Sequence, residues 1–306
     1  SLVTDSAAAA TALGTGRRTN NYHVSMTPNG TILETVLERA EVLGKTTGLV
    51  TTTRVTHATP AAFAAHVRDR SQEGEIGRQI VVEHDVEVLL GGGRDILAPY
   101  LPDAKAKGYV LVENRSALLD STAADKLLGL FAASYMSYES VRNPLVQPHL
   151  REMLNTSLQI LSRSSAGFFL MVEGGQIDTA CHNHDINNTI GETWAFNQAV
   201  ELALEFAQLN SQTLLIVTAD HETGGLIVNS TSPDLKYAWT AASHTGAKVP
   251  VFAYLAEDSA VPTFAHLTDI GGFLFQALGS PPEPPLWTQL PTDQAVEFGD
   301  GFRYDL

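Results

Sequence analysis

The sequence has few cationic residues and almost no cysteine. It contains 19 lysines and arginines against 34 aspartates and glutamates, which gives a formal net charge of −15. Such an acidic surface is a poor match for nucleic acid, because binding to phosphate backbones depends on basic patches. It also offers no broad attraction for small anions, so an anionic substrate must be held by local cations or metals. Cys181 is the single cysteine, which excludes an intrachain disulfide.

Long apolar runs are missing as well. No stretch of about 18 consecutive apolar residues occurs, so no membrane span is expected. Charged residues make up only 17% of the chain and hydrophobic residues 44%, so we expect most of the 306 residues to fold, as one large domain or two ordinary ones. Five Asn-x-Ser/Thr sequons lean towards a secreted protein: Asn29, Asn114, Asn155, Asn187 and Asn229.

Apolar runs alternate with helical stretches, which predicts an α/β fold with a sheet covered on both faces. The expected strands are 48–53, 86–90, 168–172, 213–218 and 249–255. The expected helices are 59–70, with Pro60 at its first position, 150–162, 187–209 and 266–278. Residues 91–147 read as irregular, and the Pro-rich stretch from Ser280 reads as a surface tail or linker.

Residues with ligand chemistry follow three of the expected strands. Glu173 comes directly after FFLMV, Asp220 comes after TLLIVT, and Thr59 follows GLVTTT after a short loop. Open α/β sheets place their ligand sites at the carboxyl ends of strands. Three strand ends with such residues therefore predict one site at that edge.

Imidazoles and carboxylates cluster around these positions. Asp178 and His182 are four residues apart, so on a helix they share a face. Asp220 and His221 are adjacent and can both reach one metal ion through a turn. His244 is a candidate ligand only if it lies beside one of these clusters, and taken alone it reads as a surface residue. Oxygen and imidazole ligands in this mixture suit Zn²⁺, with Mg²⁺ at an all-oxygen site. For each pair taken alone, a plain surface position is the competing interpretation.

Ser6 opens a run of alanines, in the positive end of an expected helix dipole with nothing bulky beside it. A serine next to two zinc ions indicates covalent phosphoryl transfer, although a simple N-cap serine explains the same pattern. Arg70 offers a fork for two phosphate oxygens, but from sequence alone we expect it to be exposed. Cys181 is expected to be a small buried residue, and His184 and Asp185 to face solvent.

These motifs together make the chain resemble the alkaline phosphatase family. The similarity runs in order from Val3 to about Leu278, and five segments support it: VTDSAAAATA, Val50–Pro60 (VTTTRVTHATP), VEGGQID followed by His182, VTADHETGG and SHTG. The resemblance implies a three-layer sandwich with a large, mostly parallel central sheet. It makes residues 1–279 the catalytic domain and 280–306 a C-terminal tail.

The resemblance also implies roles for individual residues. Ser6 would be the nucleophile that becomes phosphorylated, and Arg70 would clamp the phosphate. The remaining roles concern two zinc ions and one magnesium ion: Asp178, His182 and His244 for the first zinc, Asp220 and His221 for the second, Thr59 and Glu173 for magnesium, and His57 in the shell of the magnesium through water. The expected partners are small phosphate monoesters, and the expected location is extracellular, periplasmic or at the cell surface.

The sequence departs from the family at three points. The family has a first strand, upstream of the serine motif, that ends in an aspartate shared by the second zinc and the magnesium, and this chain has no residues there. Thr179 stands where relatives often have Lys, His or Trp, which affects phosphate affinity. The stretch from His221 to His244 is short, so we expect an open cleft and a small dimer contact, if the protein dimerises.

Three explanations of the missing strand stay open: a fragment of a longer protein, a strand supplied by another segment, or a crippled site. The leading interpretation is hydrolysis of phosphate monoesters through a phosphoserine. A catalytically impaired zinc-binding homologue and a phosphodiesterase or sulfatase-like hydrolase are the alternatives. The Ser6-Ala-Ala-Ala-Ala segment lacks the Cys/Ser-x-Pro-x-Arg pattern of sulfatases.

Overall fold

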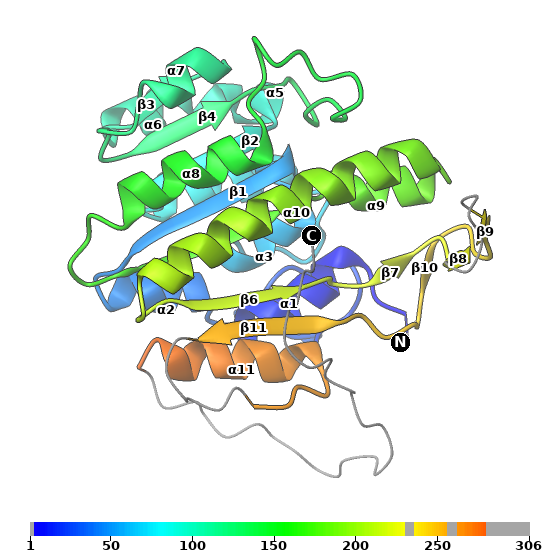
Figure 1. Cartoon of the computed structure of the whole chain (residues 1–306). Helices are drawn as coiled ribbons and strands as arrows, with labels where there is room; N and C mark the ends of the chain where they lie inside the picture. The colour runs from blue at the N-terminus through cyan, green and yellow to red at the C-terminus, as the bar shows by residue number, and fades with distance from the viewer. Residues whose placement is uncertain (1–2, 230–235, 256–261, 280–306) are drawn as a thin grey trace.

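A computed structural model describes residues 3–229, 236–255 and 262–279 of the chain (Figure 1). Its centre is a five-stranded parallel sheet in the order β3-β4-β2-β1-β5. The strands are β1 (Thr46–Arg54), β2 (Val88–Gly92), β3 (Val110–Val112), β4 (Leu127–Leu130) and β5 (Phe168–Glu173). The α/β class and the mostly parallel sheet expected from the sequence are confirmed, whereas the tail 280–306 lies outside the described residues.

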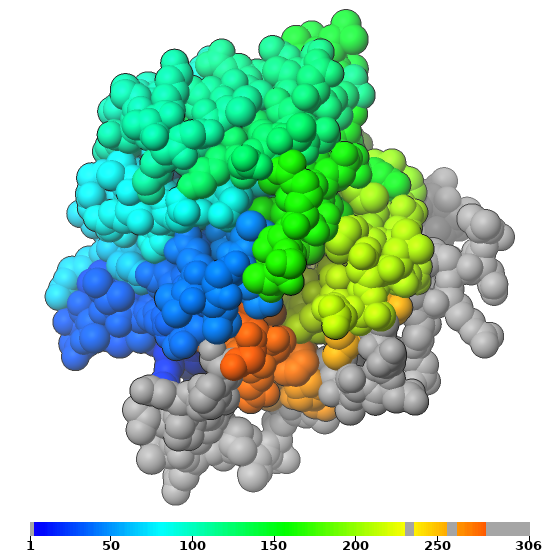
Figure 2. Space-filling model, turned by 90° about the vertical axis from the view of Figure 1, so that its left-hand side faces the viewer, coloured from blue at the N-terminus to red at the C-terminus, as the bar shows by residue number. Residues whose placement is uncertain are grey.

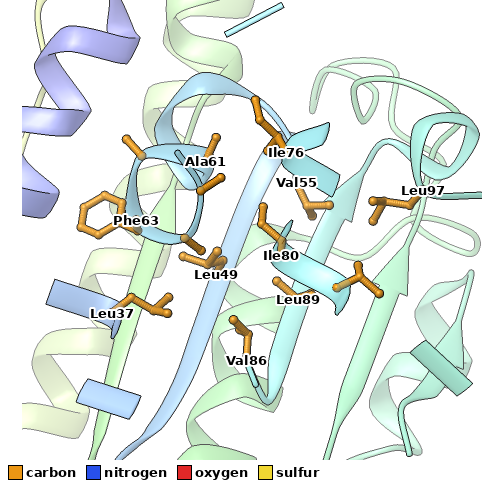
Figure 3. Close-up of a cluster of buried hydrophobic side chains, with 14 of the residues drawn as sticks. Leu37, Leu49, Val55, Ala61, Phe63, Ile76, Ile80, Val86, Leu89 and Leu97 are labelled. Atoms are coloured by element: carbon orange, nitrogen blue, oxygen red, sulfur yellow. The ribbon is translucent and has the colours of Figure 1, made fainter. Parts of the chain in front are cut away.

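Helices cover both faces of this sheet, because successive residues of its buried strands point to opposite sides. Leu49 and Leu89 pack in one apolar cluster with residues of α2 (Val36–Val42), α3 (Ala58–Ala64) and α4 (Glu73–Arg78) (Figure 3). Val50 and Val88 pack in a second cluster with α8 (Leu150–Leu161) and α10 (Ile186–Leu209). Each fully buried aliphatic side chain contributes roughly 1.5–3 kcal/mol of burial free energy. The three-layer architecture is therefore confirmed.

The alanine-rich helix α1 (Ser6–Thr15) packs unusually close to its neighbours, α3 and α11 (Leu267–Ala277). A Cβ atom added at Gly271 would lie 2.5 Å from the Gly16 nitrogen, and one at Gly14 would lie 2.8 Å from the Ala62 carbonyl oxygen. The small residues of α1 thus permit backbone-to-backbone contact and fix the start of the helix. In Figure 2 the orange surface of α11 lies next to the blue surface around α2.

A groove separates the central sheet from a second, two-stranded sheet. Strand β6 (Leu214–Thr218) pairs antiparallel with β11 (Val251–Leu255), and in the described part of the chain it pairs with no other strand. The outer edge of β5 likewise pairs with no strand among those residues. A cavity of about 870 Å³ lies between them, also lined by α10 and α11, and every residue of β5 and β6 is only half-buried.

Two short antiparallel strand pairs and a helix complete the edge of the molecule near this groove. Helix α9 (Gln176–His182) follows β5, and β7 (Glu222–Thr223) pairs with β10 (His244–Thr245). Strand β8 (Leu226–Asn229) pairs with β9 (Lys236–Trp239) at the right of Figure 1. No helix in the described residues has the length and apolar character needed to cross a membrane.

Two sequence expectations were wrong. The region 91–147 is not irregular, since it contains β3, β4 and four short helical segments: α5 (Arg94–Leu97), η2 (Ala98–Tyr100), α6 (Leu101–Ala106) and α7 (Arg115–Leu119). Elements of three to six residues are too short for an apolar period to be recognised. The helix expected over 59–70 begins at Ala58 and ends at Ala64, because the chain becomes extended at Ala65 and Val67 forms a β-bridge with Val24. The helices expected at 150–162, 187–209 and 266–278 are confirmed as α8, α10 and α11.

Candidate metal and phosphate site

The site forms where chain segments from five elements meet at one edge of the molecule. Thr59 lies in α3, which follows β1, and Asp178 and His182 lie in α9, which follows β5. Asp220 and His221 occupy the turn after β6, whereas His244 begins β10 and Ser6 begins α1. As the sequence predicts, Glu173 ends strand β5 and Asp220 follows strand β6, but β6 belongs to the second, two-stranded sheet.

Asp178, His182 and His244 offer three ligand atoms to one point in space. These atoms all lie within 4.8 Å of one another. The Nε2 atoms of His182 and His244 are 3.1 Å apart, and each is 3.5 Å from Oδ1 of Asp178. As the spacing predicts, Asp178 and His182 share one face of α9, one turn apart.

A second group surrounds the hydroxyl of Ser6. Its Oγ lies 3.1 Å from Nε2 of His221, and that nitrogen is 3.1 Å from Oδ2 of Asp220. The rings of His221 and His244 stack with centroids 3.5 Å apart, so the two groups are neighbours. Ser6 is the first residue of α1, and Asp5, not Ser6, caps this helix by accepting a hydrogen bond from the Ala8 N–H.

The donor chemistry of the first group fits a bound cation. Nδ1 of His244 lies 2.8 Å from the carbonyl oxygen of Thr4, which can only accept, so this nitrogen bears the proton and Nε2 of a neutral ring presents its lone pair. Burial alone would raise the pKa of Asp178, but the nearby His244 ring and the hydrogen bond from Thr223 lower it to about 2. An ionised carboxylate and converging imidazole nitrogens are the ligands that Zn²⁺ takes.

Glu173 lies at the end of β5 among hydroxyl groups. Thr51 donates to its Oε2 at 2.5 Å, and the Thr53 hydroxyl lies 3.4 Å from the same oxygen. Burial, together with the negative charges of Asp220 and Asp178, raises the pKa of Glu173 to about 6 against the lowering effect of the threonine hydroxyls. A hard cation bound by these oxygen atoms would offset both the burial of the charge and the repulsion between the carboxylates, so this group fits Mg²⁺.

Arg70 is half-buried rather than exposed, which corrects the expectation from its sequence neighbours. It lies in the loop after α3, and its guanidinium donates to Oδ2 of Asp5 at 3.1 Å and to Nε2 of His57 at 3.0 Å. Burial, together with the nearby cations Arg70 and Arg54, lowers the pKa of His57 to about 4. Arg70 is thus held beside the residue that precedes Ser6, with a neutral imidazole as its second support.

The remaining candidates lie as expected, with one exception. Cys181 is buried, 3.7 Å from the Thr189 hydroxyl, and His184 is exposed. Asp185 is half-buried, because its side chain caps α10. Sequence reasoning missed the hydroxyls of Thr51 and Thr223. The TTT run of β1 could have pointed to Thr51, which lies two residues before Thr53 and therefore on the same face of the strand.

Comparisons with known proteins agree with this geometry. The family model described as alkaline phosphatase matches residues 1–236. Alkaline phosphatase 3 of Bacillus subtilis is 39% identical over 246 residues, which cover 78% of this chain and 52% of the relative. The alkaline phosphatase of Escherichia coli is 31% identical over 350 residues, with 90% and 74% covered.

Solved structures give the same result. The alkaline phosphatase from the Antarctic bacterium TAB5 superposes with a TM-score of 0.80 at 27% identity, covering 92% of this chain and 85% of that one. A cold-active enzyme from a Shewanella species reaches 0.83 at 28% identity, with 91% and 87% covered. The chain spans about half the length of the Bacillus relatives that it matches. On its sequence and its fold, the chain belongs to the alkaline phosphatase family.

Proposed function

We propose that the protein hydrolyses phosphate monoesters through a phosphoserine formed on Ser6, at a site for two zinc ions and one magnesium ion. The observation that supports this most is the placement of the Ser6 hydroxyl 3.1 Å from His221, beside a second ligand group that converges on a single point. A serine between two cation sites can attack a phosphorus atom in line.

The residues divide among three cations. Asp178, His182 and His244 hold the first zinc ion, Asp220 and His221 hold the second, and Thr59 and Glu173 hold magnesium, with His57 near its shell. When bound, the zinc ions supply positive charge to the entering and departing oxygens and lower the pKa of a nearby hydroxyl.

The chain itself contributes orientation and charge. The Ser6 oxygen forms a bond to phosphorus as the bond from phosphorus to the ester oxygen breaks, the serine proton passes to solvent, and the alcohol leaves with a proton. Arg70 directs its guanidinium at the phosphate oxygens, where charge-assisted hydrogen bonds are worth roughly 1.5–3 kcal/mol. Water then attacks the phosphoserine and releases phosphate, which restores the Ser6 hydroxyl.

The groove between β5 and β6 supports the view that the active protein includes one more strand. Both facing edges are unpaired among the described residues, and the apolar residues of both strands are only half-buried. The groove also reaches Glu173 and Asp220. A strand in this groove that ends in an aspartate would put a further carboxylate between the sites for magnesium and the second zinc. We propose that residues 1–279 form the catalytic domain together with such a strand from a longer protein.

Small phosphate monoesters are the proposed substrates, and the proposed location is outside the cytoplasm. We also propose that the protein can form a homodimer. The connection between His221 and His244 is short, so the cleft should be open and the dimer contact small. The unpaired groove favours one second candidate for the 306-residue chain on its own, an impaired zinc-binding homologue. No observation in the described residues favours a diesterase or a sulfatase.

The decisive experiment is phosphoenzyme trapping. The full-length protein, loaded with zinc and magnesium, should incorporate radioactive phosphate at acidic pH and hydrolyse p-nitrophenyl phosphate. Ser6→Ala should abolish both while the zinc content stays at the wild-type value. Phosphate incorporation that persists in Ser6→Ala would refute the nucleophile. Normal zinc content with no turnover in the wild-type protein would favour the impaired homologue.

A further inference from the structure

One buried hydroxyl touches both proposed zinc groups. Oγ1 of Thr223 lies 2.5 Å from Oδ1 of Asp178 and 3.2 Å from Nδ1 of His221. Thr223 is buried, with 7% of its surface exposed. Its hydroxyl therefore hydrogen-bonds to these two partners rather than to solvent.

The single proton of this hydroxyl determines the direction of both hydrogen bonds. The carboxylate of Asp178 can only accept, so Thr223 donates its proton to Asp178. The oxygen of Thr223 is then left as an acceptor, and Nδ1 of His221 must be the donor. A neutral His221 with its proton on Nδ1 presents the lone pair of Nε2, the nitrogen that faces Ser6 and Asp220.

The backbone of Thr223 connects the same site to a third segment. Thr223 is paired with His244 in the short β7–β10 ladder, and Glu222 is paired with Thr245. The Thr245 hydroxyl also hydrogen-bonds to the Glu222 carboxylate, so side chains as well as backbone hold the two strands together. Thr223 thus fixes one residue in each of three segments: Asp178 through its proton, His221 through its oxygen and His244 through its backbone.

We propose that Thr223 is a positioning residue that couples the two zinc sites by setting the His221 tautomer and the Asp178 orientation. The inference rests on the proposed function, because it assigns these side chains to zinc. Partners that orient metal ligands typically change metal affinity 10–100-fold when removed. Removal of this hydroxyl should therefore weaken zinc binding at both sites, although Thr223 itself binds no metal.

The test compares Thr223→Val, Thr223→Ala and Thr223→Ser in the 306-residue chain. Thr240→Val is the matched control, since Thr240 lies in the same region and, among the described residues, its hydroxyl bonds to the Gly225 carbonyl and not to a proposed metal ligand. Zinc affinity is measured by competition with a chelator, and the His221 tautomer by ¹⁵N NMR of the metal-free protein. Circular dichroism verifies folding, and the alanine variant covers the case in which valine beside the carboxylate prevents it.

We expect the valine and alanine variants to bind zinc 10–100-fold more weakly and to lose the Nδ1–H form of His221. The serine variant should keep wild-type affinity and the wild-type tautomer. Unchanged zinc affinity and tautomer in the valine and alanine variants would overturn the proposal, as would equal loss in the Thr240→Val control. Phosphoserine formation is measured separately, so a failure of this inference is distinguishable from a failure of the proposed function.

Discussion

The pair formed by His66 and Glu38 makes the stability of the fold depend on pH in a way that can be tested. His66 presents both ring nitrogens to acceptors: Nδ1 lies 2.9 Å from the carbonyl oxygen of Ser25 and Nε2 lies 3.0 Å from Oε1 of Glu38. Neither acceptor can donate when Glu38 is ionised, so only the protonated imidazolium satisfies both hydrogen bonds. The pair connects the loop after α3 to α2, and its side chains are 9% and 23% exposed.

The signs of the two pKa shifts define the pH window. Burial alone would lower the pKa of His66, but the hydrogen bond to Glu38 raises it. Its contribution is therefore complete below the ordinary histidine pKa of about 6.5 and is lost as the pH rises through the higher folded value. The pKa of Glu38 is lowered by His66 against the opposing effect of burial, so its contribution is lost as the pH falls below about 4.

Glu38→Gln tests the charge with little change of shape. Glutamine at this third helical position still completes the capping box with Thr35, so the cap of α2 is retained. Loss of a charge-assisted hydrogen bond costs about 1.5–3 kcal/mol. Because His66 and Glu38 are little exposed, we expect Glu38→Gln to lower the free energy of unfolding by most of that value at pH 6. As the pH rises through the raised folded pKa of His66, this contribution is lost, so the difference between the variant and the wild type should shrink from pH 6 to pH 8.5.

The assay is urea unfolding at pH 6 and pH 8.5, followed by circular dichroism. Glu34→Gln is the control, because Glu34 is 45% exposed and forms a surface ion pair with Arg39. That change should cost less than about 1 kcal/mol at either pH. An equal loss of stability at both pH values in Glu38→Gln would refute the assignment of a charged His66.

Two further predictions concern the site and the groove. Arg70→Ala should weaken inhibition by inorganic phosphate roughly 10–100-fold, because the charge-assisted hydrogen bonds to phosphate are lost. The zinc content should stay unchanged. Isothermal titration with zinc checks this, and a loss of zinc binding would contradict the assignment of Arg70 to phosphate. Because β5 and β6 are only half-buried along the groove, the 306-residue chain should enhance the fluorescence of 1-anilinonaphthalene-8-sulfonate, whereas a longer protein that includes the added strand should not. Equal fluorescence of the two proteins would contradict the groove proposal.

The sequence predicted the parts of this protein that depend on periodicity and on strand ends. Long apolar strands and the helices α8 and α10 have enough residues for their pattern to be clear. Glu173 could be placed because β5 is parallel to its neighbours and parallel strands all finish at one edge, whereas Asp220 follows β6 of the second, antiparallel sheet. The short elements between β2 and β5 could not be placed, because their positions depend on packing rather than on local pattern.

Contacts between distant side chains were the second limit. Nothing local distinguishes Thr223 from any other threonine after a histidine, since its role depends on Asp178, 45 residues earlier in the chain. Arg70 was expected to be exposed because its neighbours Arg68 and Asp69 are charged. Its burial arises from Asp5, whose position is fixed only when α1 packs against α3.

The charges at the end of the groove connect the proposed strand to the proposed metals. Glu173 already has a raised pKa because it is buried near Asp178 and Asp220. A strand that brought another carboxylate to this place would increase the repulsion unless cations were bound, since like charges close together disfavour ionisation. Conversely, the added carboxylate would improve the site for a cation. Strand insertion and metal binding should therefore strengthen each other by the same free energy, as linkage between two binding events requires.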